Sequence, residues 1–160
     1  MTDVLASLQQ SGFAIWLRES ESIWALPTIL TLHTLGLGVL VGPSWAFDLR
    51  VLGIARSIPL APLQSLFRVM WTGFWINFFT GAMLFAADAT RKGTSTLFLT
   101  KMLFVVIGVV TLVLLKRHVY GADPNPVRVS STARLLAMAS IVVWAAAVGA
   151  GRLLAYVVEF

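Results

Sequence analysis

The stretch IWALPTILTLHTLGLGVLVGPSWAF, residues Ile23 to Phe47, decides the fold class of this chain. It holds a single ionisable side chain, His33, and it exceeds the about 20 mainly apolar residues that a bilayer-spanning helix needs. Three further apolar runs follow it along the chain. The sequence therefore predicts an all-α integral membrane four-helix bundle, with spans at about residues 23–47, 69–87, 97–115 and 135–158.

The composition supports a membrane protein and excludes several other classes. Of the 160 residues, 58% are hydrophobic and 12% are charged, whereas an ordinary soluble domain carries about 25% charged residues. The mean hydropathy is +0.86. The absence of cysteine excludes disulfides, thiolate-bound metals and iron–sulfur clusters held by this chain. We predict one transmembrane domain over residues 1–160.

The residues before the first span, 1–21, have the pattern of an amphipathic helix that lies in the membrane interface. Three acidic residues stand in this segment, and no basic head precedes a short apolar core, so we predict no cleavable signal peptide. The apolar residues recur at roughly helical spacing, at Val4, Leu5, Leu8, Ile15 and Trp16.

The basic residues indicate the orientation of the chain rather than a nucleic-acid partner. The net charge is +5, but the basic side chains flank the apolar spans, where the positive-inside rule expects them. The first and third loops carry seven of them, against five at most on the other side. We therefore predict a protein of the bacterial inner membrane, with the lipid bilayer as its partner and with both termini periplasmic.

One residue from each span is predicted to lie near the middle of the membrane. With a rise of about 1.5 Å per residue, His33 lies roughly 15 Å below the outer end of the first span, near the centre of an about 30 Å hydrocarbon layer. Counting along the other spans places Asn77, Gly108 and Trp144 at a similar depth. These residues define a predicted central layer.

The midplane histidine admits two main interpretations. In the first, a neutral His33 is hydrogen-bonded to Asn77 or to a threonine hydroxyl and fixes the helix register. In the second, His33 is an axial ligand of haem iron, and the macrocycle lies against Gly36 and the stripe Gly73-x-x-x-Asn77-x-x-x-Gly81. Small residues at this spacing let a neighbouring helix or a flat cofactor approach. Proton relay and substrate binding stay open as lesser alternatives.

The haem hypothesis requires partners for the propionates and for the iron. Lys101 and Arg152 lie near the outer ends of their spans and could receive propionates, although snorkelling towards lipid phosphates explains them as well. His118 is too far along the third span to share a haem with His33. The haem would be five-coordinate, or completed by water, a quinone-like ligand or another chain.

Several motifs resemble a family of small bacterial membrane proteins described as a domain of unknown function. They are DLRVLG (Asp48–Gly53), TGAMLF (Thr80–Phe85), TKMLF (Thr100–Phe104) and GRLLAY (Gly151–Tyr156). The resemblance implies the four-helix membrane fold. More loosely, His33 and Lys101 are similar in placement to residues of the small haem-binding membrane protoporphyrinogen oxidase and of copper-resistance membrane proteins. A Met-rich tract and clustered histidines, which copper handling would favour, are missing.

The leading functional hypothesis is a membrane protein that binds b-type haem through His33 and acts in redox or electron transfer, with Asn77 and Trp144 shaping the pocket. The alternatives are a non-enzymatic scaffold or complex subunit, alone or as a homo-oligomer, and a small-solute or proton pathway. The sequence shows no Ser/His/Asp set, paired carboxylates, phosphate-cradling glycine loop or zinc spacing. Whether the protein is an enzyme stays open. Asp48 is expected to pair with Arg56 or Arg68 at the cytoplasmic interface.

Overall fold

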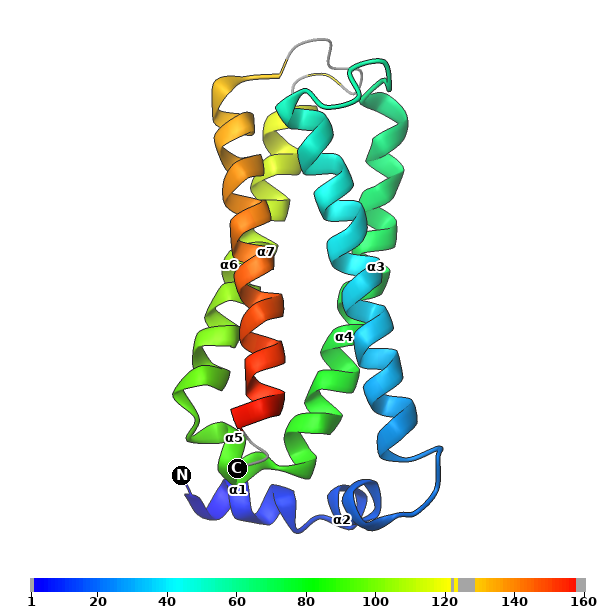
Figure 1. Cartoon of the computed structure of the whole chain (residues 1–160), viewed down its shortest axis with the longest axis vertical. Helices are drawn as coiled ribbons and strands as arrows, with labels where there is room; N and C mark the ends of the chain where they lie inside the picture. Colours follow the sequence, from blue (N-terminus) through cyan, green and yellow to red (C-terminus); the bar gives the residue numbers. More distant parts are fainter. Residues whose placement is uncertain (1, 122, 124–128, 158–160) are drawn as a thin grey trace. The chain divides into compact units, whose positions relative to one another are not determined.

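The computed structural model describes residues 2–121, 123 and 129–157 of the chain. These residues contain no strand, which confirms the predicted all-α class (Figure 1). The helices in chain order are α1 (Thr2–Gln9), α2 (Gly12–Glu19), α3 (Leu26–Leu52), the 3-10 helix η1 (Ala61–Ser65), α4 (Leu66–Ala87), α5 (Ala89–Gly93), α6 (Thr96–Tyr120) and α7 (Ser131–Val157).

The described residues fall into two compact units. The first contains the residues up to Leu40 together with Trp71–Thr96, and the second contains Val41–Met70 and the residues from Leu97 onward. Helices α3 and α4 each contribute residues to both units. The single domain over residues 1–160 stays a prediction.

Among the described residues, four helices are long and apolar enough to cross a membrane, so this is a multi-pass membrane protein. The candidate spans are Leu26–Leu52, Ala61–Ala87, Thr96–Tyr120 and Ser131–Leu154. Each span exposes large apolar side chains, which are 58–66% exposed at Leu35, Phe79, Leu103 and Val142. Such surfaces suit contact with lipid chains.

The first span ends later than its apolar run suggests. The predicted range was 23–47, but a turn occupies residues 23–25 and α3 begins at Leu26 and continues to Leu52. Gly53, with φ of 103°, then ends the helix. The Gly53 amide donates to the Arg50 carbonyl at 3.1 Å and the Ile54 amide donates to the Leu49 carbonyl at 2.9 Å, which is the Schellman pattern. The helix therefore stops where the backbone can close it, not where hydrophobicity ends.

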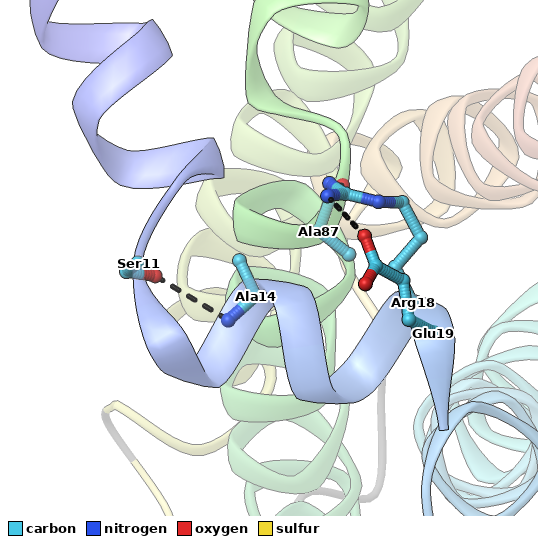
Figure 2. A network of polar contacts seen from close by, with 5 residues as sticks. All are labelled: Ser11, Ala14, Arg18, Glu19 and Ala87. Atoms are coloured by element: carbon cyan, nitrogen blue, oxygen red, sulfur yellow. Dashed lines mark hydrogen bonds and ion pairs between the residues drawn. The ribbon is translucent and has the colours of Figure 1, made fainter. Parts of the chain in front are cut away.

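The N-terminal segment, predicted as an interfacial helix over residues 1–21, consists of two short helices, α1 and α2. Ser11 has an extended backbone between α1 and α2, and its hydroxyl accepts a hydrogen bond from the Ala14 amide at 3.3 Å (Figure 2). A side chain that caps a new helix stabilises a break at that point. The helical spacing of the apolar residues continues across Ser11, so the sequence pattern does not reveal the break.

These short helices are fixed to the end of α4 and to α5, all within the first unit. Helix α1 packs against α5 (Figure 1). The Gln9 side-chain oxygen accepts a hydrogen bond from the Thr90 amide at 2.9 Å. From α2, Arg18 Nη1 donates to the Ala87 carbonyl at 3.1 Å, and Arg18 also pairs with Glu19 (Figure 2). The same unit has a small apolar cluster, formed by Leu17, Ala25 and Ala87 with Leu26, Ile29 and Met83.

Lys92 of α5 gives the first unit a pH-dependent contact outside the spans. Its Nζ donates to the Leu84 carbonyl near the end of α4, a favourable place for a cation. Burial lowers the pKa of Lys92 from its ordinary value of 10.5, and the nearby Asp88 opposes that change. The folded state therefore releases its proton at lower pH than the unfolded chain does.

We expect the melting temperature to rise with pH between the lowered pKa of folded Lys92 and 10.5, because the unfolded chain binds more protons in that window. The measurement compares thermal unfolding of the wild type and Lys92→Gln across that range. The rise should be smaller in the variant. Equal slopes in the two proteins would contradict the assignment, and Arg91→Gln, which alters an exposed neighbouring cation, serves as the control.

The second unit has an aromatic cluster near the start of α4. The Phe47 and Phe67 rings meet edge to face at 5.0 Å between centroids, and Tyr120 lies 5.9 Å from Phe47. The Tyr120 hydroxyl donates to the Leu60 carbonyl at 2.7 Å. This pairing satisfies a buried polar group and joins the end of α6 to the segment before η1.

Candidate functional site

His33 lies in the first unit, and its ring is oriented by two acceptors on α4. Nδ1 is 3.1 Å from the Asn77 carbonyl oxygen and 3.0 Å from the Thr80 hydroxyl oxygen. The Thr80 hydroxyl donates its own proton to the Ile76 carbonyl at 2.6 Å, so its oxygen accepts from the ring. Both contacts therefore assign the proton to Nδ1 and the lone pair to Nε2.

Asn77 donates a second hydrogen bond between the two helices, back to His33. Its Nδ2 donates to the His33 carbonyl at 2.7 Å, so each residue donates from its side chain to the backbone carbonyl of the other. The predicted contact of His33 with Asn77 or a threonine hydroxyl is confirmed, and both partners are used. This reciprocal pair links α3 to α4 at one register.

The glycines beside this pair bring the two helix backbones into direct contact. A Cβ atom added at Gly36 would lie 2.9 Å from the backbone nitrogen of Asn77. A Cβ atom added at Gly73 would lie 2.6 Å from the backbone nitrogen of Leu40. A Cβ at Gly81 would lie 3.1 Å from the His33 ring. The stripe on α4 thus receives a neighbouring helix, one of the two roles that its spacing predicted. The same packing fills the face of Gly36 on which the haem hypothesis places the macrocycle.

Trp144 lies in the second unit and is fully buried. A Cβ at Gly108 of α6 would approach its ring to 2.9 Å, so the indole rests on the bare backbone of that glycine. The Thr111 hydroxyl donates to the Gly108 carbonyl at 2.8 Å. The two members of the predicted central layer on α6 and α7 therefore pack together.

The two predicted propionate partners also lie in the second unit. The aliphatic part of Lys101 passes over Gly151, with its Cε 3.4 Å from the position of a Cβ there. The Arg152 guanidinium lies over the Tyr156 ring at 5.5 Å from its centroid. Both positions are compatible with snorkelling along an apolar surface.

The six predicted site residues divide equally between the units. His33, Gly36 and Asn77 meet in the first unit, whereas Lys101, Trp144 and Arg152 belong to the second. Their assembly into one cofactor site stays a prediction.

Asp48 occupies a different environment from the expected interfacial ion pair. It is fully buried in the second unit, beside Ser44 and Ser140. The Arg56 Nε donates to the Gly53 carbonyl at 3.1 Å. The expectation was wrong because it placed the end of the first span at Phe47, whereas α3 continues to Leu52 and holds Asp48 within a helix. The spacing of Ser44 and Asp48, four residues apart, was the available signal.

Among the described residues, no group of three or more histidine, aspartate or glutamate side chains could hold a metal ion together. His118 is exposed, with Nδ1 2.8 Å from the Leu114 carbonyl of its own helix. A metal at His33 would therefore need ligands other than such a cluster. Comparisons with protein-family models, curated proteins and solved structures find no match for this chain.

Proposed function

We propose that this protein is a non-enzymatic membrane scaffold or complex subunit in which His33 has a structural role. The reciprocal His33–Asn77 pair carries the proposal, because it uses the imidazole and the amide to join two spans. Polar side chains that bond across membrane helices contribute roughly 0.6–2 kcal/mol each and fix register. The Gly36 and Gly73 contact beside the pair serves the same end.

We further propose a place in the bacterial inner membrane with both termini periplasmic. The excess of arginine and lysine in the first and third loops supports this orientation. The resemblance of the Asp48–Gly53 and Gly151–Tyr156 motifs to small bacterial membrane proteins supports the bacterial setting. The partner is another membrane subunit or a second copy of the chain.

Haem ligation by His33 is the second candidate function, and the tautomer favours it. Histidines that ligate metals usually donate their other ring N–H to a carbonyl or carboxylate, as Nδ1 does here. Nε2 would hold the iron, and a b-type haem would supply one-electron chemistry. Asn77 would orient the ring. The Gly36 face is filled by α4, so it would not seat the macrocycle.

One spectrum separates the two functions. The protein is expressed with ample haem, purified in mild detergent and measured before and after dithionite, beside His33→Ala and the matched control His118→Ala. The scaffold proposal expects no Soret band in any of the three proteins. A band in the wild type and in His118→Ala that is lost in His33→Ala would replace the scaffold with a haem-binding redox component.

The structural role has its own positive test in a double-mutant cycle. We expect His33→Ala and Asn77→Ala each to destabilise the protein by about 0.5–2 kcal/mol, because each removes one side-chain hydrogen bond between α3 and α4. The double variant should lose about the sum, because both acceptors are backbone carbonyls that each single variant retains. Reversible unfolding in detergent measures the four proteins of the cycle. Single variants that are as stable as the wild type would contradict the structural role of the pair.

A further inference from the structure

Three buried side chains that carry oxygen atoms meet in the second unit. Ser44 and Asp48 stand four residues apart on α3 and so share one face of the helix. Ser140 comes from α7, and its hydroxyl lies beside the Asp48 carboxyl group together with that of Ser44. All three residues are 0% exposed.

The hydrogen bonding of this cluster is unlike that of the other membrane hydroxyls. None of its four side-chain oxygens makes a hydrogen bond of acceptable geometry. Several hydroxyls elsewhere in the spans donate to a carbonyl of their own helix, as Thr31 does to Pro27 at 2.8 Å and Thr111 does to Ile107 at 3.0 Å. That is the usual way for such a group to be satisfied in a helix. Ser44 and Ser140 are instead turned towards the carboxyl group.

The nearby arginines do not neutralise the carboxyl group. Arg50 donates to the Ile58 and Arg56 carbonyls, and Arg56 donates to the Gly53 carbonyl. A buried carboxylate without a partner is costly, so buried charges are paired or coordinate a cation. Carboxylate and hydroxyl oxygens are hard donors that suit hard cations.

The charge and the number of oxygens select the kind of cation. One carboxylate balances a single positive charge, whereas a divalent ion would leave an uncompensated charge in a low-dielectric interior. A proton would also neutralise the carboxyl group, but the protonated group bonds to each serine hydroxyl separately and does not gather the three side chains around one centre. A small metal ion can take lone pairs from all three side chains at once. Fully buried side chains on packed helices favour a small ion with few waters.

We propose that Ser44, Asp48 and Ser140 form a binding site for a sodium ion that links α3 to α7 within the second unit. The ion takes the carboxylate and the two hydroxyls as ligands, and water or backbone carbonyls complete its coordination. This site is independent of His33 and of the scaffold and haem alternatives. Ion binding stabilises the folded state because the unfolded chain cannot assemble the three ligands.

The test measures equilibrium binding of radiolabelled sodium to the purified full chain in lipid nanodiscs, with choline as the competing cation. We expect one saturable site in the wild type and its loss in Asp48→Asn. Ser44→Ala and Ser140→Ala should each weaken binding by at least about tenfold, the lower scale for altered metal surroundings. The matched control is Thr111→Val, which removes a buried hydroxyl that already has carbonyl partners, and it should bind sodium like the wild type.

Thermal unfolding provides a second readout. At equal ionic strength the wild-type melting temperature should be higher in sodium than in choline, and the difference should vanish in Asp48→Asn. If that variant does not fold, the two serine variants still decide the matter. Absence of sodium binding by the wild type, or unchanged binding by both serine variants, overturns the proposal. A carboxyl infrared band that shifts with pH, without sodium binding, would assign the cluster to a proton and overturn it too.

Discussion

Replacing Trp144 with alanine is expected to lower the free energy of unfolding by about 3–5 kcal/mol, the scale for deleting a fully buried large aromatic side chain. The indole is 0% exposed and rests on Gly108 of α6. Removing it leaves a cavity beside a glycine, which has no side chain that could move in to fill it. Reversible unfolding of the detergent-solubilised protein measures the loss.

The matched control for Trp144→Ala is Val142→Ala, two residues earlier on the same helix. Val142 is 66% exposed, so its truncation should change stability by no more than about 0.5 kcal/mol. A Trp144→Ala loss below about 1 kcal/mol, or one as small as that of Val142→Ala, would show that the indole does not support the packing of α6 with α7.

A single methyl group at position 73 should have the second largest effect. Gly73→Ala would place a Cβ 2.6 Å from the Leu40 nitrogen and 2.8 Å from the Gly36 oxygen, both of them backbone atoms that cannot rotate away. Overpacking of this kind costs about 1–3 kcal/mol. This overpacking cost opposes the gain of about 1 kcal/mol that alanine brings over glycine in a helix. A net loss of stability in Gly73→Ala would therefore show that the backbones of α3 and α4 are in close contact at this position.

Gly38→Ala is the control for this prediction, because a Cβ at Gly38 meets nothing within 4 Å. It should be neutral or stabilising by up to about 1 kcal/mol, since helix propensity alone acts there. Guanidinium or urea unfolding, or thermal unfolding where these are unsuitable, compares the two variants with the wild type. If both glycines tolerate alanine equally, the backbone contact between α3 and α4 in the first unit is not close.

The sequence predicts the four spans because apolar runs of this length are typical of transmembrane helices. It predicts the ends of the helices less well. Helix ends depend on local closure, as at Gly53, and on caps, as at Ser11. Ser130 acts similarly at the start of α7, where its hydroxyl accepts from the Ala133 amide at 3.1 Å. These contacts involve single residues and leave little trace in a hydrophobicity pattern.

The candidate site was predicted in part. Helical rise alone places His33 and Asn77 at one depth, and the structure joins them. The depth of a residue does not show which face of its helix packs against a neighbouring backbone. Only the structure therefore shows that α4 packs against Gly36. The cluster at Asp48 was missed because a charged residue after an apolar run is typical of an interface, and only the continuation of α3 to Leu52 places it inside.

The contacts at the end of α4 have a consequence for how this protein is made. Gln9 and Arg18 leave the ribosome well before their long-range hydrogen-bond partners, which are Thr90 and Ala87. The Ala87 carbonyl and the Thr90 amide do not exist until α4 and the start of α5 have been synthesised. Helices α1 and α2 therefore reach their final positions only after α4 and α5 have formed, and until then their apolar side chains need cover from the membrane surface or from a chaperone.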